Sequence, residues 1–106
     1  MMRLRVQNAL RATVMALAVT ALGGCGGLVY AVQAGSAASK LEQAKEVGAE
    51  QRAPYEYYLA QQHMLKAQEE ASQANYGDAI DLCEIAEQSA DKAIQLAREA
   101  HRGAGR

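Results

Sequence analysis

Small and apolar residues recur at steps of four and three through most of this chain, which is the spacing of one stripe along an α-helix. The first stripe consists of Tyr30, Ala34, Ala37, Leu41, Ala44 and Gly48. The second consists of Ala53, Tyr57, Ala60, Met64, Ala67, Ala71 and Ala74. The third consists of Ala79, Cys83, Ala86, Ala90, Ala93, Ala97 and Ala100. No stretch alternates as a strand does, so the pattern predicts an all-α fold.

Two breaks divide the stripes into three predicted helices. One is the single proline, Pro54, and the other is the Asn-Tyr-Gly-Asp sequence at 75–78. The helices have matched lengths and alanine seams that allow close approach, and the third has a wide apolar arc. These features favour an antiparallel three-helix bundle with coiled-coil-like seams. The join at 48–54 is either a tight reversal or a kink at Pro54, and we favour the reversal.

The residues at the predicted helix ends agree with this division. Pro54 suits a first helical position, and Glu56 places a negative charge in the first turn. Asp78 is expected to cap the third helix, and Gly103 is expected to end it. His101, with Arg98 and Arg102, falls in its last turn.

A leader precedes these helices. Arg3, Arg5 and Arg11 give it a basic start, and the uncharged run 12–22 has the length of a signal peptide and is too short to span a membrane. Leu22-Gly23-Gly24-Cys25 follows at once and resembles the lipobox of bacterial lipoproteins. That resemblance implies recognition of Leu22, Gly23 and Gly24 by a signal peptidase and acylation of Cys25, for example with palmitate. The alternative is an uncleaved helix with an incidental cysteine.

The expected organisation is therefore a signal peptide at 1–24, a lipid anchor and flexible tether at 25–27, an alanine-rich helical domain at 28–102 and a disordered tail at 103–106. The chain has 11 basic and 12 acidic residues. Loss of three arginines with the leader leaves 8 against 12, a net charge of −4. An acidic product without clustered Lys or Arg argues against nucleic acid as a partner.

Acylation would leave Cys83 as a single thiol. An odd cysteine in an oxidising compartment is either buried or pairs between chains. Its place on the third stripe favours burial, because free cysteine behaves as a small hydrophobe.

The run from Gly48 to Tyr57 (GAEQRAPYEY) resembles a known group, as do several later positions. These are Ala60, Leu65, Lys66, Ala67, Glu70, Ala71, Tyr76, Ala79 and Ala86. Together they are similar to an uncharacterised alanine-rich helical domain of small bacterial lipoproteins, sometimes found ahead of an OmpA-like peptidoglycan-binding domain. The likeness covers about residues 34–100 and implies a compartment and a fold but no activity. We expect no OmpA-like extension, so direct anchoring to peptidoglycan by that module is not implied.

A weaker resemblance, to one tetratricopeptide unit, lies in Tyr76, Ala79, Ile80, Cys83 and Ala86. No second copy of the 34-residue unit is present, and a lone unit lacks the stacked groove that binds peptides. We interpret it as shared helix-hairpin geometry.

Catalytic chemistry is not evident in the sequence. His63 and His101 lie on different predicted helices without further ligands at metal-binding spacing. The carboxylates follow exposed arcs, and an alanine-lined bundle has little room for a dry pocket. We expect no enzyme activity, no metal, no cofactor and no small-molecule substrate.

Tyr58 and Leu65 lie seven residues apart on one helix face, close to the direction of Tyr76. They either pack against the first helix or form a partner surface. The sequence predicts a lipid-anchored structural or interaction protein, held in the bilayer through acylated Cys25 on the periplasmic side of the outer membrane. Its partner would be an envelope protein or a second copy. The alternative is a tetratricopeptide-like adaptor that binds peptides in an envelope assembly.

Overall fold

The structure, a computed structural model, describes residues 1–22 and 25–105, without the side chains of residues 16–22. Regular structure in these ranges is entirely helical, and no strand occurs in them. The helices are α1 (Met2–Leu22), α2 (Cys25–Glu46), α3 (Ala49–Arg52), α4 (Pro54–Ser72) and α5 (Tyr76–Ala104). The prediction of an all-α fold is confirmed.

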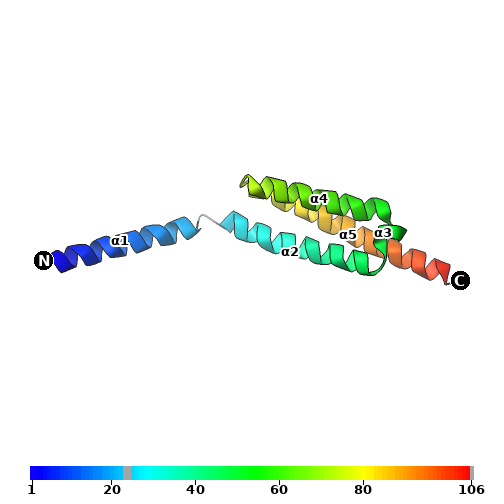
Figure 1. The fold of residues 1–106 in the computed structure, drawn as a ribbon, viewed down its shortest axis with the longest axis horizontal. Coiled ribbons are helices and arrows are strands. Elements are labelled where there is room, and N and C mark those ends of the chain that lie inside the picture. Colours follow the sequence, from blue (N-terminus) through cyan, green and yellow to red (C-terminus); the bar gives the residue numbers. More distant parts are fainter. Residues whose placement is uncertain (23–24, 106) are drawn as a thin grey trace.

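Helices α2, α4 and α5 lie side by side, and the short α3 joins α2 to α4 (Figure 1). α5 packs along both α2 and α4. α2 and α5 run in one direction and α4 runs in the other (Figure 1). α1 points away from these packed helices, which makes the molecule long and narrow, with extents of 86 × 22 × 13 Å.

The chain reverses direction between α2 and α4, so the reversal that we favoured at 48–54 is what the structure has. Gly48 adopts a left-handed conformation with φ of 78°, which favours glycine because it lacks a Cβ atom. Its N–H donates to the carbonyl of Lys45 across 3.0 Å. After the single turn α3, Pro54 opens α4 and Glu56 lies in the first turn, as predicted.

The second connection lies earlier than the sequence predicts. Ala74 has the left-handed φ of 61°, and Asn75 is held by Glu70. The Asn75 backbone N–H donates to the Glu70 carbonyl, and its Nδ2 donates to Glu70 Oε2, each across 2.9 Å. α5 therefore begins at Tyr76, and the predicted cap, Asp78, lies in the first turn instead.

Three predictions for glycine positions are wrong. Gly26 and Gly27 belong to α2 rather than to a flexible tether. The ring of Tyr76 covers them, and a Cβ atom on Gly26 would lie 3.3 Å from it, so glycine permits this close contact. Gly103 does not end α5, which continues to Ala104, so this part of the expected tail is helical.

The core consists almost entirely of the predicted stripes. Ten of its alanines and Cys83 have no exposed surface, namely Ala37, Ala44, Ala49, Ala60, Ala67, Ala79, Ala86, Ala90, Ala93 and Ala97. Tyr57, Met64, Ala53 and Ile94 are buried with them. The predicted burial of Cys83 is confirmed. Ala74 and Ala100 are exposed because they lie at helix ends that no neighbour covers, whereas Ala49 is buried although it lies off the predicted stripes. Ile94, in the apolar arc beside the third stripe, is buried as well.

Candidate functional site

Cys25 is the first residue of α2 and is exposed. It is the only lipobox residue whose side chain the structure describes. Gly23 and Gly24 lie outside the described residues, as does the side chain of Leu22. The structure therefore places the proposed lipid-bearing atom at one end of the packed helices.

Within the described residues, no helix combines the length and the hydropathy that a membrane crossing requires. This includes α1, which lies within the predicted leader.

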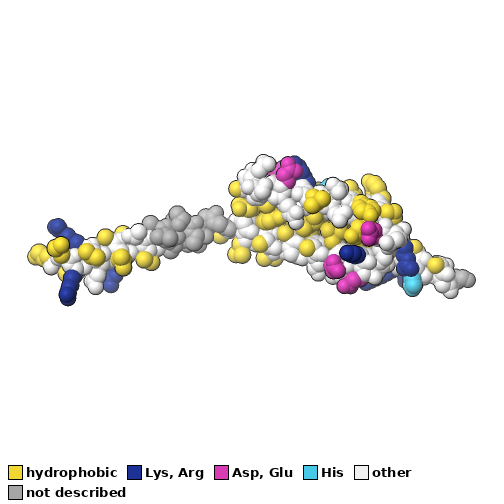
Figure 2. All heavy atoms as spheres, viewed as in Figure 1, with side chains coloured by type: hydrophobic (Ala, Val, Ile, Leu, Met, Phe, Trp, Pro, Cys, Tyr) yellow, Lys and Arg dark blue, Asp and Glu magenta, His cyan; other side chains and the backbone are white. Residues whose placement is uncertain are grey.

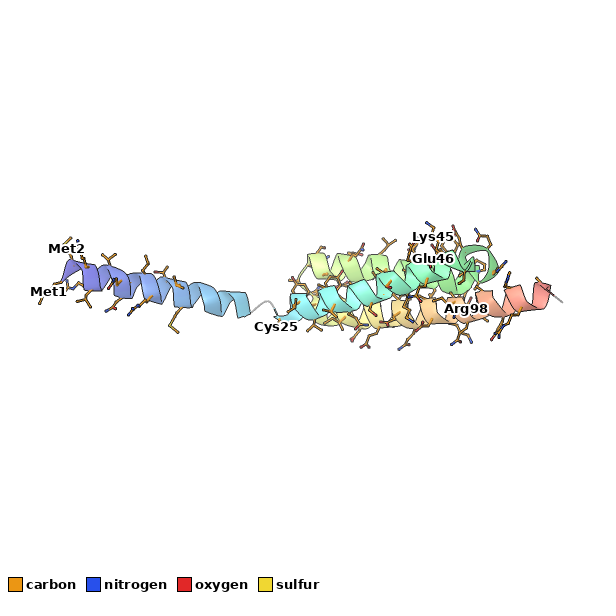
Figure 3. All side chains as sticks on the ribbon, turned by 90° about the horizontal axis from the view of Figure 1, so that it is seen from below. Met1, Met2, Cys25, Lys45, Glu46 and Arg98 are labelled. Carbon is orange, nitrogen blue, oxygen red and sulfur yellow. The ribbon has the colours of Figure 1, made fainter. Side chains whose placement is uncertain are left out.

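A groove of about 980 Å³ lies toward the other end of α2, where the α2–α3 corner meets the last turns of α5. Figure 3 shows Cys25 at one end of the packed helices and Lys45, Glu46 and Arg98 toward the other. The charged residues that line the groove are Glu46, Arg52, Arg98, Glu99 and Arg102, together with His101. Apart from His101, three of these side chains are basic and two are acidic, and they lie beside Val47 and Ala97, which are apolar.

The sequence did not predict this groove. Arg98, His101 and Arg102 were predicted to lie in the last turn of the third helix, and His101 and Arg102 do, whereas Arg98 lies earlier because α5 continues to Ala104. The groove is also formed by the corner between α2 and α3, and the position of this corner does not follow from the three stripes.

The predicted surface of Tyr58, Leu65 and Tyr76 is divided in the structure. Tyr58 and Leu65 are 44% and 53% exposed, so neither is packed into the core. Tyr76 instead lies against α2, with its ring centre 6.2 Å from that of Tyr30. The three residues therefore do not form one patch.

A different aromatic patch occurs at the start of α4. Tyr55, three residues before Tyr58 and thus on the same helix face, is 73% exposed. Both line a shallow apolar hollow of about 420 Å³ with Pro54, Leu59 and Gln62. The i, i+3 spacing of the two tyrosines was the signal in the sequence that could have identified this patch.

Tyr58 is held in place by two neighbours. Its hydroxyl donates to Glu50 Oε1 across 3.0 Å, and its ring meets Tyr57 edge-on with 5.2 Å between centres. The hydrogen bond and the negative charge of Glu50 raise the pKa of Tyr58 above its ordinary value, so its phenol stays protonated and remains a hydrogen-bond donor.

Polar contacts join α2 to α5 along one side. Glu87 accepts hydrogen bonds from Gln33 and Ser36, and Lys40 pairs with Asp91 across 2.9 Å. Burial raises the pKa of the Cys83 thiol, as does, to a smaller degree, the negative charge of Glu87. A buried thiol held in its neutral form is a structural group rather than a nucleophile.

The described residues contain no group of three or more His, Cys, Asp or Glu side chains placed to hold a metal ion. His63 Nδ1 lies 2.8 Å from the Leu59 carbonyl oxygen of its own helix, and His101 lines the groove.

Comparison with known protein families decides the classification. Residues 32–104 match the family model described as a domain of unknown function, DUF4398. The chain belongs to this family. The match begins within α2 and ends with the last residue of α5, so the DUF4398 region covers nearly all of the packed helices. No curated protein and no solved structure matches the chain. This match confirms the part of the predicted resemblance that concerns an uncharacterised domain.

Proposed function

We propose that this DUF4398 chain is a lipid-anchored interaction protein of the bacterial cell envelope. The sequence Leu22-Gly23-Gly24-Cys25, placed directly after a basic and apolar leader, carries this proposal. Cleavage before Cys25 and acylation of its sulfur would leave α2–α5 as the mature domain. We propose the periplasmic face of the outer membrane as its site, because Gly26 stands where an aspartate would resemble an inner-membrane retention signal.

The mature domain would be an alanine-seamed antiparallel three-helix bundle of α2, α4 and α5. The close contacts that such seams allow make a rigid unit without a large core. Its role would be to present side chains to a partner. The exposed Tyr55 and Tyr58 suit this role, because tyrosine is enriched in protein interfaces and loses little conformational entropy on binding.

We propose an envelope protein or a second copy of the chain as the partner of this aromatic surface. Leu65 lies on the same face, and Tyr76 would act indirectly by holding the start of α5 against α2.

The groove at the α2–α3 corner favours a second candidate, an adaptor that binds a peptide. Its lining combines basic and acidic side chains with apolar surface, which would suit a peptide segment that carries charges of both signs. Such an adaptor would lose binding when Arg98 and Arg102 are replaced by Gln, whereas the aromatic surface would be unaffected.

Mass spectrometry of the full chain expressed in a bacterium tests the proposed anchor. The expected N-terminal peptide begins at Cys25 and carries the mass of two or three acyl chains, since a single chain binds membranes only marginally. Cys25→Ser should accumulate as an uncleaved precursor, and Cys83→Ser, the matched control, should be processed normally. A processed but unacylated wild-type chain would refute the proposal.

A further inference from the structure

The first two turns of α2 carry an exposed apolar stripe in register with Cys25. Leu28, Val29 and Val32 follow Cys25 at i+3, i+4 and i+7, which places all four on one face of the helix. Leu28 and Val32 are each 70% exposed and Val29 is 54% exposed. Figure 2 shows hydrophobic side chains gathered over this end of the packed helices.

The core-facing side of α2 is different, because Tyr30, Ala34 and Ala37 face the core. The stripe lies beside the side of α2 that contacts α5, where Gln33 and Ser36 donate to Glu87, but Leu28, Val29 and Val32 themselves stay more than half exposed. Beyond Val32 the same face continues with Gly35, Ser36 and Ser39, which are exposed and not apolar. Its apolar part is thus confined to the turns beside Cys25.

The same turns carry no charge. No Asp, Glu, Lys or Arg occurs from Cys25 to Ser39, and Lys40 is the first. At a rise of 1.5 Å per residue, Lys40 lies about 22 Å along the helix axis from Cys25. Glu70, which lies at this end on α4, is already engaged by Lys66 and Asn75.

We propose that this stripe inserts into the interfacial layer of the bilayer beside the acyl chains of Cys25. The inference rests on the proposed anchor. An interfacial helix lies in the plane of the interface and buries its apolar face about 5–10 Å deep, and the stripe would extend about 10.5 Å along this plane, from Cys25 to Val32. The sulfur and the three apolar side chains share one face, so the acyl chains would enter the bilayer from the side of α2. The domain would then rest on the membrane in a fixed orientation.

A second copy of the chain is a poorer occupant for this stripe. A stable protein interface contains about 20–30 residues on each side, and the stripe offers three aliphatic side chains. Interfacial insertion needs no such area, because acylation already holds the chain at the surface.

Tryptophan fluorescence tests the inference, because the chain contains no tryptophan. Leu28→Trp and Val32→Trp, each in the full chain purified from bacterial membranes, are reconstituted into phosphatidylethanolamine–phosphatidylglycerol vesicles with brominated acyl chains. Ser39→Trp is the matched control, since it lies on the same face two turns beyond Val32. Circular dichroism establishes that each variant keeps its helix content, and mass spectrometry of the same samples measures acylation.

The indoles of Leu28→Trp and Val32→Trp should emit at shorter wavelength, lose most of their emission to the brominated lipid, and be quenched by aqueous acrylamide several-fold less than that of Ser39→Trp. Equal acrylamide quenching at all three positions in an acylated chain would overturn the inference and leave the anchor standing. Protection from both quenchers would also overturn it, in favour of self-association. An unacylated Cys25 would overturn the anchor and this inference with it.

Discussion

Glu87 of α5 accepts a hydrogen bond from Gln33 of α2 across 2.8 Å, between residues 54 positions apart in the chain. Its other carboxylate oxygen accepts from Ser36 across 2.9 Å. One carboxylate thus holds two successive turns of α2 against α5, in a part of the molecule where most core contacts are made by alanine.

Glu87→Ala should therefore destabilise the folded chain by about 1.5–3 kcal/mol, the range for hydrogen bonds to a charged group. Urea denaturation measures the change, and Glu84→Ala, at an exposed position one turn earlier on α5, is the control. Equal effects of the two substitutions would show that the contacts with α2 contribute nothing to stability.

The alanine seam should not accept larger side chains. Ala90 has no exposed surface, so Ala90→Leu should cost about 1–3 kcal/mol through overpacking and lower the thermal midpoint. Ala100→Leu, at an exposed position on the same stripe, should leave the midpoint nearly unchanged. An unchanged midpoint for Ala90→Leu would mean that the seam is loosely packed.

The exposed positions on α4 should separate binding from stability. Tyr58→Ala and Leu65→Ala should change the free energy of unfolding by no more than about 0.5 kcal/mol, as surface substitutions usually do. Tyr57→Ala, at a buried position next to Tyr58, should cost about 3–5 kcal/mol, as large-to-small substitutions of buried aromatic residues do.

The same variants, in lipidated form, test the partner surface in affinity capture from membranes. Tyr58→Ala should abolish capture of the envelope partner while the protein remains folded. Capture at the wild-type level by folded Tyr58→Ala and Leu65→Ala would remove this surface as the binding site.

Stability should fall in alkaline solution because of Cys83. Burial raises the pKa of its thiol in the folded state, so the unfolded state loses its proton first as the pH rises. The stability that the neutral thiol contributes is complete below the unfolded-state pKa and is lost as the pH rises through the folded-state pKa. Burial also raises the pKa of the Tyr30 phenol, which contributes in the same direction.

Urea midpoints measured from neutral to alkaline pH check this prediction. Cys83→Ala should flatten the alkaline decline, and Tyr30→Phe should remove the share that comes from the phenol. An identical decline in the wild type and in Cys83→Ala would contradict a role for the thiol.

Helical periodicity predicted the core because a stripe that faces neighbours must repeat at the helix period. It failed at Ala74 and Ala100, where burial depends on whether another helix extends that far. Ala49 was missed because it lies off the stripes and is buried at the reversal, against residues such as Ile94 that are distant in sequence.

The candidate surfaces were harder to predict. A helical wheel treats Tyr76 as a residue on the face of one helix, whereas Gly26 and Gly27 of α2 admit its ring at a contact between helices. The groove arises from three segments whose meeting depends on the reversal at Gly48. Gly26 and Gly27 suggested a tether because glycine disfavours helix in isolation, but packing against Tyr76 outweighs that preference.

The seam of fully buried alanines also constrains how the sequence can change over time. Most other side chains are larger than alanine and would push the helices apart, and glycine would weaken each helix. Neutral substitutions should therefore be concentrated on the solvent-facing sides of the helices, while small residues persist in the seam at steps of four and three. Distant relatives would then keep the spacing of their alanines even where their overall sequence identity is low.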